Sequence, residues 1–152
     1  MVKKLAVLVI VLSVAAIVIG GVFIGEGVAK NKLIVDRMNV EKVSLALDPN
    51  SPGIYTQINN AAEAQKAADT IASHRRAIAP TYQDLLGKGR FDPTNPQHLT
   101  YAQAMNLENY LYMAVTAFGL IQVTMANGLF MVIVGVGLGC VGIVLMRLGK
   151  TA

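Results

Sequence analysis

The sequence of 152 residues is poor in the side chains from which disulfides and metal centres are built. It contains one cysteine, Cys140, two histidines, His74 and His98, and no tryptophan. A lone cysteine cannot form a disulfide within the chain, so any folded domain must be held by packing. Two histidines without an H-x-x-x-H spacing also fall short of the usual zinc patterns. These shortages argue against a disulfide-stabilised domain and against a histidine-rich metal centre.

Motifs for nucleophilic catalysis and nucleotide binding are also lacking. There is no G-x-S-x-G and no P-loop. The segment from Gly137 through Gly139 to Gly142 matches the dinucleotide pattern G-x-G-x-x-G, but it lies within a long apolar run. That motif binds nucleotides only where it follows a strand and opens an exposed helix. We therefore predict a protein that is not an enzyme, with no catalytic residue, cofactor or bound metal.

Charged residues are scarce and unevenly placed. They make up 14% of the chain, against 54% hydrophobic residues, and the net charge is +4. Residues 25–111 contain nine basic and nine acidic side chains, so the middle of the chain is neutral. The excess positive charge comes from Lys3, Lys4, Arg147 and Lys150. A neutral middle does not fit a nucleic-acid partner.

Two long apolar runs place the chain in a lipid bilayer. Residues 5–24 include a single polar side chain, Ser13, and no charge. As a helix they would extend about 30 Å, the thickness of the hydrocarbon layer. Residues 112–146 are likewise uncharged, and at about 52 Å they exceed what one span requires. We predict an uncleaved transmembrane anchor at residues 1–25 and a second span at 127–148.

The basic residues at both ends predict the orientation of these spans. Under the positive-inside rule both termini lie in the cytoplasm of a multi-pass cell-membrane protein, and residues 26–126 form an extracytoplasmic domain. The alternative is a tight hairpin at residues 126–128, which would make two short spans of residues 112–146. That hairpin would leave Arg147 and Lys150 outside the cell, against the same rule.

The middle of the chain predicts a small, mainly helical domain with one short strand, within an all-α membrane protein. Turn and capping residues set the expected boundaries. The expected elements are a helical extension over 26–38, a strand over 40–47, a turn over 48–53, a helix over 54–79 ended by Pro80, a short helix over 82–86 ended by Gly87, and a last helix from Asn95-Pro96 to about residue 148. Asn60 and Glu63 have capping-box spacing, so a later start of the middle helix is the alternative.

Small residues on both spans predict close helix packing. Gly135 and Gly139 form one G-x-x-x-G pattern, and Gly21 and Gly25 form another. The expected helix-packing residues are Ser13, Ala16, Gly20, Gly21, Gly25, Gly135, Gly139 and Gly142. The two spans pair either with each other or with other chains. Besides the lipid bilayer, the expected partners are further copies of the chain or other membrane subunits.

An apolar stretch at residues 99–125 would stand above the bilayer and needs cover. The middle helix, the extended first helix or another subunit could supply it. Tyr101, Tyr110 and Tyr112 have helical spacing and are expected to pack in this domain. The stretch favours a structural or accessory subunit. The alternative function is an extracytoplasmic sensor that binds a ligand or metal, with His74 and His98 as candidate contacts and Asp69 or Asp92 as added ligands.

Three segments of the chain resemble a known group of proteins. They are Ala-Asp-Thr-Ile-Ala-Ser-His at 68–74, Pro-Thr-Tyr-Gln-Asp-Leu at 80–85 and Ala-Val-Thr-Ala-Phe-Gly at 114–119, with His74, Tyr82 and Phe118-Gly119 the most distinctive. The chain resembles small bacterial proteins with two transmembrane helices and no settled function, which often carry the label aromatic ring-opening dioxygenase. That activity needs an iron site in a soluble pocket, which this sequence does not supply. The arginine expected before the second span is replaced by the nearby Glu108-Asn109-Tyr110. The resemblance implies the two-span topology.

Overall fold

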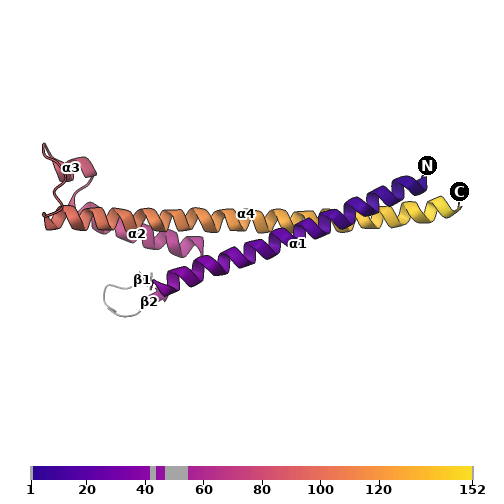
Figure 1. Cartoon of the computed structure of the whole chain (residues 1–152), viewed down its shortest axis with the longest axis horizontal. Coiled ribbons are helices and arrows are strands. Elements are labelled where there is room, and N and C mark those ends of the chain that lie inside the picture. Colours follow the sequence, from indigo (N-terminus) through magenta and orange to yellow (C-terminus); the bar gives the residue numbers. More distant parts are fainter. Residues whose placement is uncertain (1, 42–43, 47–54, 152) are drawn as a thin grey trace. The chain divides into compact units, whose positions relative to one another are not determined.

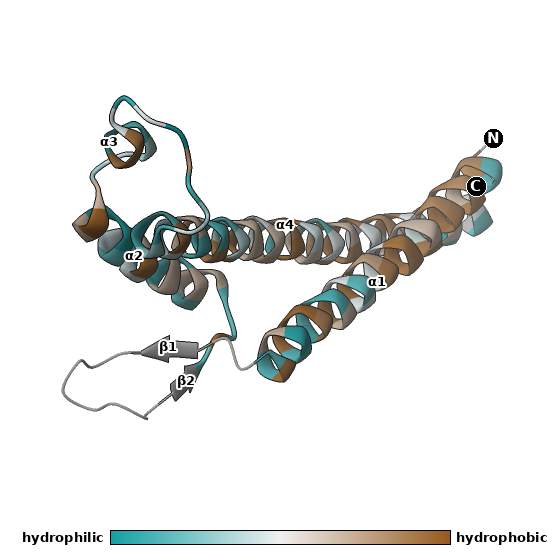
Figure 2. Cartoon of the chain, turned by 60° about the vertical axis from the view of Figure 1, so that its left-hand side comes forward, coloured by the Kyte–Doolittle hydropathy of each residue, from teal (hydrophilic) through white to brown (hydrophobic). Residues whose placement is uncertain are grey.

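The computed structural model describes residues 2–41, 44–46 and 55–151. The elements are α1 (Val2–Val40), β1 (Ser44–Ala46), β2 (Tyr55–Gln57), α2 (Ala61–Ile78), α3 (Tyr82–Leu86) and α4 (Pro96–Thr151) (Figure 1). The chain is therefore mainly helical. Both α1 and α4 are long and apolar enough to cross a membrane. In Figure 2 hydrophobic residues line much of both helices, and hydrophilic residues gather on α2 and the loop after α3.

The chain divides into two compact units. One consists of Met1–Lys32 and Leu120–Ala152 and is called here the helix pair; the other, Leu33–Gly119, is called the helical domain. α1 and α4 each contribute to both units. The predicted spans at 1–25 and 127–148 fall wholly within the helix pair.

In the helical domain, a capping box sets the start of α2. The side chain of Asn60 accepts a hydrogen bond from the backbone N–H of Glu63 at 3.0 Å, and the Glu63 carboxylate accepts one from the N–H of Asn59 at 2.7 Å. These bonds satisfy backbone donors that a helix start leaves free. The expected start near residue 54 is wrong, because the chain is still extended at β2 and the cap comes later. The expected end before Pro80 is correct.

An alanine face of α2 forms the core of the helical domain. Ala64, Ala67 and Ala68 are buried with Leu111 and Phe118 of α4. Ile58, just before the helix, is also fully buried, and Ile34, Val35 and Met38 of α1 pack against the same cluster. Because alanine has a short side chain, two helices can approach closely along such a face. Burying Phe118 alone contributes about 2 to 3 kcal/mol.

The predicted strand over 40–47 differs from what the structure describes. α1 continues through Val40, and among the described residues of this stretch Ser44–Ala46 form a strand, β1. β1 pairs antiparallel with β2, with Leu45 opposite Thr56. Residues 42, 43 and 47, and the predicted turn at 48–53, lie outside the described residues.

The boundaries of α3 and the start of α4 follow from local capping. Thr81 accepts a hydrogen bond from the N–H of Asp84 at 3.1 Å, and Gly87, at φ 55°, ends α3. Asn95 accepts one from the N–H of Gln97 at 2.9 Å, with Pro96 at the first helical position as predicted. α4 then runs without a break through residues 126–128. The hairpin alternative is therefore wrong.

Candidate functional site

A seam of small residues joins α1 and α4 within the helix pair. The buried residues of α1 are spaced seven apart: Ala6, Ser13, Gly20 and Gly27. α4 repeats the spacing with Gly128, Gly135 and Gly142, which are buried, and Gly149, which is half-buried. A seven-residue repeat keeps one face of a helix against its partner. The structure thus has two matching heptad series of small residues.

The two series meet in opposite chain directions. Gly142 lies beside Ile10 and Ala6, Gly135 beside Ile17 and Ser13, Gly128 beside Gly20, and Gly149 beside Lys3. The helix pair is therefore antiparallel, and the two ends of the chain lie at the same end of the pair (Figure 1).

The glycines of the seam bring the two backbones together. A Cβ built on Gly20 would lie 2.6 Å from the carbonyl oxygen of Gly128, and one built on Gly128 would lie 2.7 Å from that of Gly20. A Cβ on Gly135 would lie 2.9 Å from the carbonyl oxygen of Ser13. Separations this short do not occur for real Cβ atoms, so only glycine fits here. Close backbone approach is the usual function of small residues between membrane helices.

A polar contact crosses the same seam. The buried hydroxyl of Ser13 donates a hydrogen bond to the carbonyl oxygen of Gly135 at 2.7 Å. A hydroxyl in an apolar environment needs such a partner, because leaving it unpaired costs free energy. Ser13 therefore packs as a small residue and is also satisfied as a polar one.

The predicted helix-packing residues divide into two groups in the structure. The seam contains five of them, Ser13, Gly20, Gly135, Gly139 and Gly142, and Ala16 is half-buried. Gly21 and Gly25 lie outside the seam: a Cβ on either would meet nothing within 4 Å. At 100° per residue they lie on another side of α1 from Gly20. The second G-x-x-x-G thus takes no part in this contact.

Several seam residues were missed from the sequence. These are Ala6, Gly27, Gly128 and Gly149. The signal was present as the seven-residue spacing, which runs over four members in each helix. G-x-x-x-G patterns cover only one turn and do not reveal a longer series.

An ion pair between a partly buried arginine and a buried glutamate joins α2 to α4 in the helical domain. The Nε of Arg75 lies 2.7 Å from Oε2 of Glu108, and Nη2 donates to Oε1 at 3.3 Å. The same guanidinium donates to the hydroxyl of Tyr101 and lies 5.0 Å from the centre of its ring. The bond to Glu108 raises the pKa of Arg75. Tyr101 is fully buried, and its ring lies 6.2 Å from that of Tyr82.

The other two tyrosines of α4 differ from Tyr101. The Tyr112 hydroxyl donates to the carboxylate of Asp69 at 2.9 Å, which adds a second polar link to α2 and raises the pKa of Tyr112. Tyr110 is 68% exposed. Tyr101 and Tyr112 therefore pack in the domain as predicted, whereas Tyr110 points out of it.

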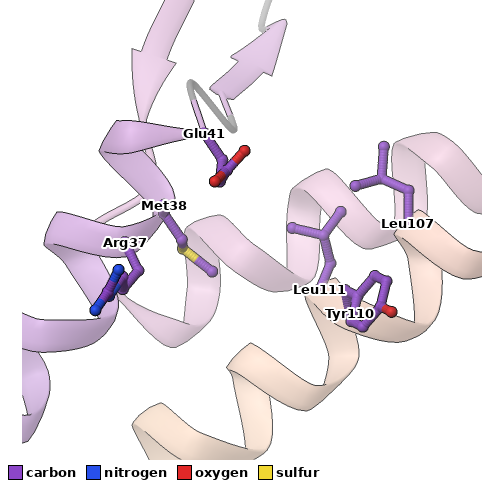
Figure 3. A pocket seen from close by; sticks show the side chains of 6 residues that line it. All are labelled: Arg37, Met38, Glu41, Leu107, Tyr110 and Leu111. Atoms are coloured by element: carbon purple, nitrogen blue, oxygen red, sulfur yellow. The ribbon is translucent and has the colours of Figure 1, made fainter.

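An apolar strip of α4 in the helical domain is left uncovered. Leu107, Tyr110 and Met113 are 38%, 68% and 65% exposed, and together they are called here the open stripe. Leu107 and Tyr110 also line a groove of about 510 Å³, together with Leu111 of α4, Arg37 and Met38 of α1, and Glu41 directly after α1 (Figure 3). α2 and the end of α1 thus cover one side of the predicted apolar stretch and leave the other side open.

The two histidines have different surroundings. Nδ1 of His98 accepts a hydrogen bond from the N–H of Asp92 at 3.0 Å, and its ring stacks on Phe91 at 5.7 Å. The Asp92 carboxylate accepts bonds from the hydroxyl and N–H of Thr94, which lower its pKa. His74 is exposed on α2. Within the described part of the chain, no three His, Cys, Asp or Glu residues are grouped to hold a metal.

No protein-family model matches the chain, and neither a curated protein nor a solved structure matches it significantly.

Proposed function

We propose that the chain is a non-enzymatic integral membrane protein, a structural or accessory subunit. In this proposal the helix pair anchors the helical domain on the outer side of the cell membrane. The helical domain then joins the chain to a second copy through the open stripe. The observation that carries the proposal is the exposure of Leu107, Tyr110 and Met113, which precede the predicted span at 127–148.

The register of the helix pair supports this membrane placement. Lys3 lies beside Gly149, so Lys3, Lys4, Arg147 and Lys150 belong to one end of the pair. At the other end Gly27 meets Met125, next to the first acidic residue of α1, Glu26. The 21 residues from 5 to 25 lie between these charges. They extend about 31 Å, which matches the hydrocarbon layer.

On this placement the open stripe faces water in a lone chain. Tyrosine and methionine are enriched in protein interfaces, and an apolar strip of this kind is a typical contact surface. The neighbouring groove has a basic residue, Arg37, near the end of α1 and an acidic one, Glu41, directly after that helix. In a contact with two-fold symmetry each could face its opposite in the other copy. This self-complementary charge favours a second copy of the chain over an unrelated subunit.

Cysteine cross-linking in native membranes tests the proposal. In a Cys140→Ser background, Met113→Cys places a thiol on the open stripe, and Ser73→Cys places one on the exposed side of α2 as a control. Oxidation should convert Met113→Cys, but not Ser73→Cys, to a species of twice the chain mass. An adduct of another mass would identify a different subunit instead. Equal yields from both variants, or none from either, would refute assembly through the stripe.

The sensor alternative has less in its favour. His98 is engaged by the backbone of Asp92 and by Phe91, both in the loop that precedes α4. These two contacts indicate that His98 stabilises the loop conformation.

A further inference from the structure

The antiparallel helix pair gathers four basic side chains from opposite ends of the sequence. Lys3 and Lys4 are on the first turn of α1, and Arg147 and Lys150 are on the last turns of α4. The position of Lys3 beside Gly149 shows that these turns are neighbours. A cleft of about 210 Å³ at this end is lined by Ile143, Met146, Arg147 and Lys150. It combines two apolar side chains with two cations.

In the part of the chain that the structure describes, no acidic side chain pairs with this cluster. Among the described residues none of the four cations forms an ion pair, and all four are exposed. In the segments that make up the helix pair, the acidic residue is Glu26, which lies at the opposite end. Four positive charges on two adjoining helix ends form a strong local attraction for an anion.

The chemistry of the cleft indicates what that anion is. Arginine and lysine donate hydrogen bonds to phosphate oxygens, and Ile143 and Met146 suit the start of an acyl chain. We propose that this end of the helix pair is a binding site for the phosphodiester headgroup of an anionic phospholipid in the inner leaflet. The inference rests on the proposed function, because it needs the basic end to lie at the cytoplasmic surface. Basic pockets between membrane helices on that side are suited to such headgroups.

Native mass spectrometry of the full chain in detergent micelles measures the binding. The probes are phosphatidylglycerol and, as the uncharged comparison, phosphatidylcholine. The wild-type chain should retain phosphatidylglycerol preferentially. Each basic side chain near the surface is worth about 1 kcal/mol, or about fivefold in affinity. Lys3→Gln with Lys4→Gln, and separately Arg147→Gln with Lys150→Gln, should therefore each weaken retention about 25-fold.

The control removes two charges from the other end of the helix pair, with Lys30→Gln and Lys32→Gln. It should change retention less than twofold. An equal loss in the control would refute the site, since the effect would then follow net charge alone. Displacement of the lipid by millimolar glycerol phosphate would assign the cluster to a free phosphate and overturn the lipid assignment.

The two proposals fail separately. Cross-linking through Met113→Cys reports assembly, whereas lipid retention reports the basic end. Retention lost in the Lys3 and Arg147 variants with unchanged cross-linking supports the headgroup site alone. Retention unaffected by either pair refutes the headgroup site whatever the cross-linking yield.

Discussion

Gly20 and Gly21 are adjacent in α1, yet they should respond in opposite ways to the same substitution. A Cβ on Gly20 would lie 2.6 Å from the carbonyl oxygen of Gly128 and 2.9 Å from Cγ2 of Val132. The first contact is with backbone, so it cannot be relieved by a rotamer change and the helices must move apart. A Cβ on Gly21 meets nothing within 4 Å. The two sites are neighbours on the same helix but differ in their contact with α4.

The expected magnitudes follow from these distances. Overpacking in Gly20→Ala should cost about 1 to 3 kcal/mol of helix association. Replacing glycine by alanine within a helix returns up to about 1 kcal/mol of helix propensity, at both sites. Gly21→Ala should therefore be neutral or stabilising. The difference between the two variants removes the shared propensity and leaves about 1 to 3 kcal/mol for the close approach.

Energy transfer between labels on α1 and α4 provides the assay. Val7 and Val144 are both exposed and stand near the same level of the helix pair. Cysteines at these positions in a Cys140→Ser background accept a donor and an acceptor, and titration with sodium dodecyl sulfate separates the helices. The titration gives a free energy of helix association for each variant. Free energies that agree within about 0.5 kcal/mol for Gly20→Ala and Gly21→Ala would refute the close approach at Gly20, since surface substitutions ordinarily change stability by no more than that.

Three further predictions use other contacts. Ser13→Ala should weaken the free energy of helix association by about 0.6 kcal/mol in the same titration, because one interhelical hydrogen bond is lost. The Gly135 carbonyl keeps its place in α4. A loss above about 2 kcal/mol would contradict the assignment of a single ordinary hydrogen bond to Ser13. Arg75→Met should destabilise the helical domain by about 3 to 5 kcal/mol, because Glu108 is left buried without its partner. Urea unfolding followed by tyrosine fluorescence measures this loss. Adding Glu108→Leu should recover most of it, and no recovery would contradict the pairing. The Asp92 carboxyl should titrate below its ordinary value of 3.8 in a carbon NMR titration, and Thr94→Val should raise its pKa toward that value. Since the folded pKa is lowered, the stability this group contributes is present above the ordinary pKa and is lost as the pH falls through the lower folded one.

Local signals predicted the element boundaries well where a capping residue, proline or glycine stood without a competing signal nearby. Asn95 with Pro96 marked the start of α4, and Gly87 marked the end of α3. The start of α2 was missed because an earlier segment also has a start signal: Ser51 followed by Pro52 matches the N-cap and first position of a helix. Asn60 could be preferred only once its bond to the Glu63 backbone was known. Two competing caps in one segment cannot be ranked without the packing that follows them.

The seam was predicted only in part because a G-x-x-x-G pattern shows that a helix has a smooth patch, but not which helix covers it. Gly21 and Gly25 satisfy the pattern and face away from α4, whereas Gly27 and Gly128 belong to the contact. The heptad series carries more information, since a partner must follow a long helix over many turns.

The link between Arg75 and Glu108 had no local signal at all. The two residues lie 33 positions apart on different helices. Charged residues at such spacing are common on solvated faces, and only the fold shows that Glu108 is buried and that Arg75 is partly buried beside it.

The heptad seam also leaves the alignment of the two helices open to error. Because Ala6, Ser13, Gly20 and Gly27 are all small, a slip of seven residues, about 10 Å, would again set small residues against small ones. Even the Ser13 hydroxyl would find another glycine carbonyl. The seam therefore favours contact without defining its alignment. That choice falls to side chains of unequal size outside it, such as Ile34 and Met38, which pack against the core containing Leu111 and Phe118. A chain that keeps both helices of the pair but lacks residues 33–119 between them should therefore insert as a hairpin of mixed alignment.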